Sequence, residues 1–166
     1  MTKPIINLDD LEYQEWGNGD RFEARLGAIS ARIGAHNLGY NLTILSPGKC
    51  AFPFHSHRAN EEMFFILEGE GEVRLGPDRH PVRSGDVIAC PSGGPETAHQ
   101  IINNSKSAEL KFLAVSTQLS PEVAEYPDSN KTGVMSQLPP GPDGKPRVLR
   151  FVVQEDAGFA DYWDDE

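Results

Sequence analysis

His55-Ser-His57-Arg-Ala-Asn-Glu61-Glu62-Met-Phe-Phe-Ile-Leu-Glu-Gly69 is the segment that governs both the fold and the chemistry of this chain. Residues two apart in an extended strand point to the same face, so His55 and His57 are expected to lie side by side. A carboxylate follows at Glu61 or Glu62, at the head of an apolar run rich in aromatic residues. Imidazole and carboxylate groups together suit a divalent metal ion. The segment therefore predicts a metal site at the start of a buried strand.

The length and charge of the chain limit its partners. Its 166 residues are close to the size of one domain and are enough for a core without disulfide bonds. The 15 Lys and Arg residues against 25 Asp and Glu residues give a net charge of −10, which repels nucleic-acid phosphates and anionic lipids. We therefore expect a small-molecule substrate or ligand, and neither a nucleic acid nor a membrane as partner.

The cysteines and the N-terminal residues indicate a reducing compartment. Cys50 and Cys90 are too few for the disulfide scaffold of a secreted domain. The first ten residues, MTKPIINLDD, lack the apolar core of a signal peptide, and no run approaches the ~18 apolar residues of a spanning helix. We expect a cytoplasmic protein in which both cysteines fill small apolar spaces.

Short apolar runs separated by Gly, Pro, Asn and Asp predict an all-β fold. The 16 Gly and 13 Pro residues suit turns between strands, and the spacing of the runs is that of a sandwich or barrel. Gly69-Glu-Gly71 and Gly76-Pro-Asp-Arg79 are expected to be consecutive hairpin turns. The predicted strands are Leu38–Leu45, Met63–Leu67, Glu72–Leu75, Val87–Cys90, Ala98–Ile102, Leu110–Thr117 and Arg147–Val153.

Both ends of the chain differ from its middle. Residues 1–37 are expected to form an N-terminal extension that packs on the barrel and contains one helical turn or an edge strand. Residues 118–166 are expected to form a C-terminal extension, because residues 118–146 are too rich in Pro and Gly for regular structure. Within it, residues 126–131 are either a turn or a lid over a substrate. The acidic and aromatic residues 159–166 are expected to anchor the tail.

The histidine segment resembles the first signature motif of the cupin superfamily, as found in single-domain bacterial cupins of the RmlC-like, Cupin_2 type. That motif is a Gly, five residues, His-x-His, three or four residues, Glu, six residues and a Gly. Here six residues rather than five separate Gly48 from His55, while His57, Glu62 and Gly69 fit the spacing. The downstream half of the motif therefore matches in full.

The second signature motif of the family is present as well. It is a Gly, five residues, Pro-x-Gly, two residues, His, three residues and an Asn. The chain has Gly85, Pro91, Gly93, His99 and Asn103 in this order, with three additional residues before His99. Because insertions in loops are tolerated, His99 is expected to keep its place at the start of the following strand.

The resemblance covers residues 38–117 and implies a cupin double-stranded β-helix, a jelly-roll barrel with irregular N- and C-terminal extensions, which forms a homodimer. The six-residue spacing selects Glu62 rather than Glu61 as the family's carboxylate, and strand alternation then places Phe64 and Ile66 on the same inner face. One divalent transition metal, which could be Fe, Mn, Ni, Co or Zn, would bind inside the barrel. Its ligands would be His55, His57, Glu62 and His99.

Two classes of function are compatible with such a site. The first is a metal-dependent small-molecule enzyme, either dioxygenase-like or similar to sugar-phosphate isomerases. An isomerase needs a general base near the metal, for which Glu61, Glu96 or a further histidine are candidates, while a dioxygenase needs an oxidisable metal with two open positions. The second class is a non-catalytic module that binds a sugar or small polar metabolite. The fold by itself does not choose between them.

Overall fold

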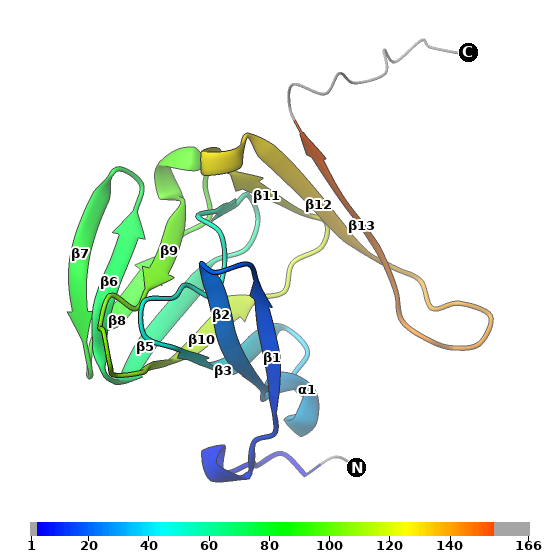
Figure 1. Cartoon of the computed structure of the whole chain (residues 1–166). Helices are drawn as coiled ribbons and strands as arrows, with labels where there is room; N and C mark the ends of the chain where they lie inside the picture. Colours follow the sequence, from blue (N-terminus) through cyan, green and yellow to red (C-terminus); the bar gives the residue numbers. More distant parts are fainter. Residues whose placement is uncertain (1–2, 155–166) are drawn as a thin grey trace.

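The computed structural model, which describes residues 3–154, consists almost entirely of antiparallel β-strands (Figure 1). Helical structure in this part of the chain is confined to one turn of α-helix, α1 (Ser30–Ile33), and the short 3-10 helices η1 (Leu8–Asp10), η2 (Pro95–Thr97) and η3 (Pro127–Ser129). No helix among these residues is long and apolar enough to cross a membrane. The expected all-β class is therefore confirmed.

A six-stranded and a three-stranded sheet enclose the core. The larger sheet has the order β1-β2-β3-β10-β5-β8 and the smaller one β7-β6-β9. The strands of the larger sheet, in that order, are Tyr13–Asn18, Phe22–Ala28, Leu38–Leu45, Leu110–Thr117, Glu62–Glu68 and Val87–Cys90. Those of the smaller sheet are Asp78–Arg83, Glu70–Leu75 and His99–Ile102. All seven strands that the sequence predicts are present, with end residues that differ by at most two positions.

The core lies on the inner faces of these sheets. Strand alternation turns Phe64 and Ile66 of β5 inward, as expected, where they are almost fully buried. Phe112 of β10 is 2% exposed and meets the ring of Phe64 edge to face at 5.7 Å between centroids. The same inner face of β5 begins with Glu62, so the core leads directly to the predicted carboxylate ligand.

The N-terminal extension contains both a helical turn and an edge strand, the two alternatives that its sequence suggests. Residues Leu8–Asp10 form the 3-10 turn η1, which Asn7 caps through its side-chain oxygen. Strand β1 then follows as the outermost strand of the large sheet, and β2 joins it to β3. The residues before β3 thus widen the sheet rather than forming an irregular covering.

The expectation of an irregular C-terminal extension is wrong for residues 122–138 and is correct for residues 118–121 and for the Pro-rich loop at residues 139–146. Strands β11 (Glu122–Tyr126), β12 (Lys131–Leu138) and β13 (Arg147–Gln154) form a third sheet with the short strand β4 (Ser56–His57). Residues 126–131 are the tight connection between β11 and β12, where η3 and a left-handed Asn130 (φ 49°) reverse the chain. Pro residues flank these strands, and Gly133 lies within β12 without interrupting it. Residues 159–166, the expected anchor, lie outside the described residues.

Gly69 forms a corner between two sheets, and the expectation of a hairpin there is wrong. Strand β5 pairs with β10 and β8, whereas β6 pairs with β7 and β9, so the chain leaves one sheet at Gly69 and enters the other. Its φ of +85° favours glycine, and a Cβ at this position would lie 2.3 Å from the carbonyl oxygen of Glu109. The second expected turn, at Gly76, does connect the β6–β7 hairpin.

We predict that Gly69→Ala destabilises the barrel more than the matched change Gly85→Ala. Both glycines have positive φ, but a Cβ at Gly85 meets nothing within 4 Å. The left-handed conformation costs about 1–2 kcal/mol for alanine, and the backbone clash at Gly69 adds about 1–3 kcal/mol. Urea unfolding of the two variants measures the difference. Equal losses of unfolding free energy would contradict the close approach of Gly69 to Glu109.

Candidate metal centre

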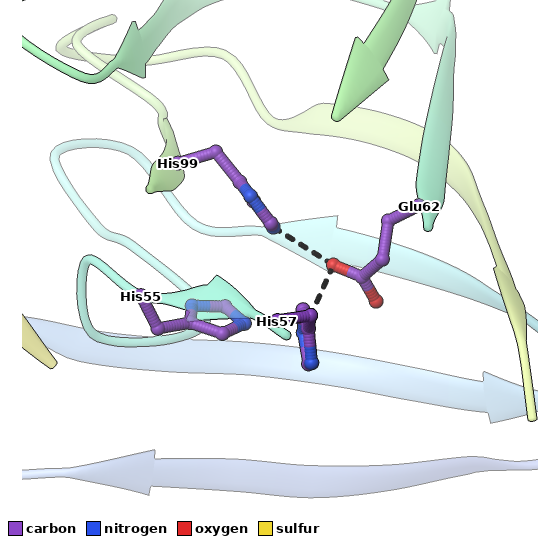
Figure 2. Close-up of side chains that lie close together, drawn as sticks. All are labelled: His55, His57, Glu62 and His99. Carbon is purple, nitrogen blue, oxygen red and sulfur yellow. Dashed lines mark hydrogen bonds and ion pairs between the residues drawn. The ribbon is translucent and has the colours of Figure 1, made fainter. Parts of the chain in front are cut away.

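Three segments of the barrel bring four side chains to one place. His55 and His57 lie next to and within β4, Glu62 is the first residue of β5, and His99 is the first residue of β9. One nitrogen or oxygen atom from each side chain lies within 4.8 Å of those from the other three (Figure 2). The structure thus gathers the four residues that the sequence singles out.

Backbone hydrogen bonds join the two motifs at this point. The N–H of His99 donates to the carbonyl oxygen of His55 at 2.8 Å, and the N–H of His55 donates to that of His99 at 3.2 Å. The three additional residues before His99 are accommodated by the turn η2, which leaves β9 in place. The insertion therefore lengthens a surface loop and does not displace His99 from the cluster.

The carboxylate of Glu62 lies between two of the imidazoles. Its Oε2 atom is 2.8 Å from Nε2 of His99 and 3.6 Å from Nε2 of His57 (Figure 2). The Nδ1 atom of His55 lies 2.8 Å from the carbonyl oxygen of Pro53, so Nε2 is the ring nitrogen that remains free. The arrangement offers imidazole nitrogens and one carboxylate toward a common point.

Electrostatics keep two of these groups, His55 and Glu62, in protonation states that suit coordination. Burial, together with the positive charge that His99 and His57 can carry, lowers the pKa of His55 to about 4, so this imidazole is neutral at physiological pH. Burial would raise the pKa of Glu62, but the adjacent imidazoles of His57 and His99 hold it well below its usual range. Burial also acts to lower the pKa of His57, yet Glu62 and Glu122 raise it above the ordinary value. A neutral imidazole and an ionised carboxylate are the forms that bind metals.

The unsatisfied atoms of the cluster also fit a cation. Both ring nitrogens of His57 and Nδ1 of His99 are buried and have no hydrogen-bond partner among the described residues. A buried polar atom without a partner costs about 1–3 kcal/mol. A divalent ion coordinated by Nε2 of His57 would remove part of this cost, and the donor set of three imidazoles and one carboxylate suits Fe, Mn, Co, Ni or Zn.

Glu122 is a component of the centre that the sequence did not reveal. It is 3% exposed, and its carboxylate accepts hydrogen bonds from the backbone N–H groups of Ala59 (3.1 Å), Asn60 (2.9 Å) and Val123 (2.9 Å). The side-chain amide of Asn60 donates to it as well. One of its oxygens lies 3.7 Å from Nδ1 of His57. Glu122 therefore anchors the loop between the two ligand segments and faces the outer nitrogen of one imidazole.

Glu61, the alternative to Glu62 as the carboxylate ligand, lies outside the cluster of four residues. Its side chain is exposed, and its backbone N–H donates to the hydroxyl of Thr117 at 3.0 Å. Glu96, another candidate base, is also exposed and accepts a hydrogen bond from the N–H of Gly94. Neither lines a cavity that any of the four clustered residues lines.

Three cavities meet at the cluster. The inner one, of about 180 Å³, has walls of Phe52, Phe64, Phe112 and small aliphatic residues, with the amides of Asn41 and Gln100 as its further polar groups. Among the residues that line it there is no lysine or arginine. Two outer cavities, of about 300 and 220 Å³, lie between the barrel and the β12–β13 hairpin and also reach His57. The inner cavity is thus the apolar approach to the cluster.

The contacts of the two cysteines and of the loop at residues 126–131 indicate structural roles. Cys90 pairs with Glu62 across β8 and β5, and burial followed by the Glu62 charge raises the pKa of its thiol to about 12. Burial also raises the pKa of Cys50, which is 4% exposed. Both are free cysteines in the core, as expected. In the loop, Asp128 forms an ion pair of 2.7 Å with Arg74 of β6 and so ties the third sheet to the barrel.

Similarity to solved structures extends over nearly the whole chain. A crystal structure from Silicibacter pomeroyi, described as a sugar phosphate isomerase from a cupin superfamily, matches with a TM-score of 0.74 and 23% sequence identity. The match covers 96% of this chain and 98% of that chain, so it includes the third sheet. At this level of identity the likeness shows the fold.

Sequence similarity to curated proteins covers shorter parts. Quercetin 2,3-dioxygenase of Bacillus subtilis is 30% identical over 84 residues, which are 49% of this chain and 25% of that protein. The oxalate-binding protein of Thermotoga maritima is 25% identical over 118 residues, which are 69% of this chain and 93% of that protein. The chain spans less than half of the length of two curated relatives, 46% of one and 25% of the other.

A family model agrees with the fold. Residues 41–116 match the model described as a cupin domain, and the matched range runs from β3 to β10. It includes all four clustered residues and both sequence motifs. Residues 41–116 therefore form a cupin domain with the double-stranded β-helix fold.

Proposed function

We propose that this protein is a metal-dependent enzyme that acts on a small molecule. The observation that carries the proposal is the convergence of four donor groups within 4.8 Å at the end of an apolar cavity. A single divalent transition metal would be held there, and four protein ligands on an octahedral ion leave two positions for substrate or water. When bound, such an ion acts as a Lewis acid, and an oxidisable one such as Fe also supports reaction with O₂. The ligands would be His55, His57, Glu62 and His99.

The walls of the inner cavity favour an uncharged substrate. Aromatic and aliphatic side chains surround the space next to the cluster, and none of its lining residues carries a permanent positive charge. A phosphate group buried in this cavity would lack the cationic partner that such anions require. A compact organic molecule with neighbouring oxygen atoms fits better, since its oxygens could face the metal and its carbon skeleton could contact Phe52, Phe64 and Phe112.

Among the enzymatic alternatives, these features favour oxidation by O₂ over isomerisation. An isomerase needs a general base that reaches the substrate, but Glu61 and Glu96 do not line the cavities at the cluster. Glu122 lines only the two outer cavities, and its carboxylate accepts hydrogen bonds from three backbone N–H groups. A dioxygenase mainly needs an oxidisable metal with two open positions. The partial similarity to quercetin 2,3-dioxygenase supports the same reaction class. The resemblance to an oxalate-binding protein keeps a non-catalytic binding module as the second candidate.

The location we propose is the cytoplasm. Both cysteines are free and buried, which is compatible with a reducing compartment. The net charge of −10 further argues for a small-molecule partner rather than a nucleic acid or an anionic membrane.

We predict that the purified protein binds one equivalent of a divalent transition metal. His57→Ala and Glu62→Gln each remove one ligand, so we expect both variants to lose most of the bound metal after dialysis. His80→Ala, which changes an exposed histidine on β7, is the matched control and should retain it. Elemental analysis by mass spectrometry measures the metal bound per protein chain. Equal metal in all four proteins would refute the proposed ligand set.

We predict that Glu122→Gln weakens metal binding by about 10- to 100-fold, because removal of a carboxylate behind a ligating histidine typically has this effect. Isothermal titration with Co²⁺ measures the Kd. Glu125→Gln makes the same chemical change on the same strand, where the carboxylate pairs with the exposed Arg58, and should leave the Kd unchanged. Asn60→Ala loosens the same loop while keeping the Glu122 carboxylate, so an equal loss in this variant would assign the effect to the loop alone.

We predict O₂-dependent turnover of uncharged substrates that carry adjacent oxygen atoms. The Fe²⁺-loaded protein should consume O₂ with a panel of catechols and flavonols, measured with an oxygen electrode, and Glu62→Gln should abolish the uptake. Sugar phosphates serve as the contrasting panel. Product formation that persists under argon would replace the dioxygenase proposal with an isomerase, and binding without turnover would replace it with a binding module.

A further inference from the structure

The third sheet turns one face toward the smaller outer cavity, the one of about 220 Å³. Ala124 of β11 pairs with His57 of β4 on one side and with Gly133 of β12 on the other. Gly133 in turn pairs with Val152 of β13, the outermost strand of the sheet (Figure 1). Residues that pair directly across strands share a face, and all four of these positions line the cavity. The smaller outer cavity is therefore enclosed by this face of the third sheet together with His55.

Gly133 keeps this space open. It is not among the glycines with positive φ, so its backbone conformation does not require glycine. A Cβ at this position would lie 3.4 Å from the ring of Tyr126 and 3.6 Å from the side chain of Val152, which are ordinary van der Waals distances. Glycine weakens the interior of a strand, so the structural effect of this residue is the space that it leaves.

Tyr126 gives the smaller outer cavity an aromatic side. Its ring is half-buried and stacks on the imidazole of His55, with 5.9 Å between the ring centroids and 21° between their planes. The side chain of Val152 contributes an aliphatic surface to the same cavity. Both surfaces suit a flat ring with little polarity.

Arg150 brings a positive charge to this cavity. Among the described residues that line the three cavities at the cluster, it is the only lysine or arginine. It lies two positions before Val152 and therefore on the same face of β13. Its guanidinium forms no ion pair or hydrogen bond with another residue in the range 3–154. The donors of this guanidinium are thus available to a ligand.

The charges around Arg150 favour a carboxylate over a phosphate. A guanidinium binds a planar carboxylate through two parallel hydrogen bonds. A phosphate monoester carries about −1.5 to −2 charges at pH 7, more than one guanidinium balances. Glu122 lines the same cavity and the chain has a net charge of −10, so a second negative charge on the ligand would be repelled. The smaller outer cavity therefore suits a ligand with a single negative charge.

We propose that the smaller outer cavity is a second binding site, which takes a small aromatic acid. The carboxylate of the acid binds Arg150, and its ring lies against Tyr126 in the space beside Gly133. The site is distinct from the inner cavity, which has no cationic lining residue. Because His55 and His57 line both cavities, the bound acid lies next to two of the proposed metal ligands. The proposal does not depend on metal binding or on turnover.

Titration of the full chain with benzoate, followed in amide NMR spectra, tests the proposal. We expect saturable shifts at the amides of Gly133 and Arg150, with a Kd of about 1 mM or below for a ligand of this size. The Kd should be the same for the protein as purified and after metal removal with EDTA. Arg150→Gln should raise the Kd by about tenfold or more, because it removes a charge-assisted pair of hydrogen bonds. Benzamide, the uncharged analogue, should bind more weakly than benzoate to the wild-type chain.

Gly133→Val tests the cavity separately from the charge. It fills the space beside Tyr126 while Arg150 remains, so we expect it to weaken benzoate binding as well. Arg147→Gln is the matched control, because Arg147 lies on the opposite face of β13 and lines none of the three cavities. This variant should keep the wild-type Kd for benzoate.

Several results would overturn the proposal. An equal rise of the Kd in Arg147→Gln and Arg150→Gln would assign binding to the overall charge of β13, and an unchanged Kd in Arg150→Gln would exclude the guanidinium as the partner. Binding that is lost with EDTA, or shifts confined to residues of the inner cavity, would place the acid at the metal centre instead. Absence of benzoate binding to the wild-type chain would likewise reject the site.

Discussion

The pair of backbone hydrogen bonds between His55 and His99 is the contact on which the candidate centre depends. These residues are 44 positions apart in the chain, and the two bonds of 3.2 and 2.8 Å hold their segments in fixed register. A register shift by one residue would turn both side chains away from the interior. Once this register is fixed, the cluster is completed by Glu62, which is the first residue of β5 and lies on its inward face. The geometry of the centre is therefore a property of strand pairing.

The third sheet supports this arrangement from outside the barrel. Strand β4 carries His57 and is only two residues long, so it has little stability of its own. Pairing with β11 gives it a neighbour, and Glu122 at the start of β11 binds the backbone that follows His57. The segment after the cupin domain thus contributes to the position of a residue within the domain. The structural likeness to the Silicibacter pomeroyi protein also extends over nearly the whole chain and does not stop at the barrel.

Local patterns account for most of what could be predicted from the sequence. Strands β3, β8 and β10 have the predicted bounds, because their apolar runs end at polar or turn-forming residues. The clustering of Glu62 with three histidines was implied by the resemblance to the two cupin motifs, and the structure brings these four residues together. The strands β11 and β12 were missed because Pro and Gly around them resemble loop composition, while their pairing with β4 depends on distant residues. Glu122 was missed for the same reason, because its carboxylate accepts a hydrogen bond from Asn60, which is 62 positions away in the chain.

The placement of Cys90 has a consequence for the durability of the protein. If the centre reacts with O₂ as we propose, a thiol beside it would be exposed to oxidation, which proceeds through the thiolate. Here burial and the adjacent Glu62 carboxylate raise the thiol pKa to about 12, so the group stays protonated across the physiological range. Burial, the larger of the two causes, thus protects the sulfur from oxidation. The strand pairing that places Glu62 at the cluster also buries the thiol beside it.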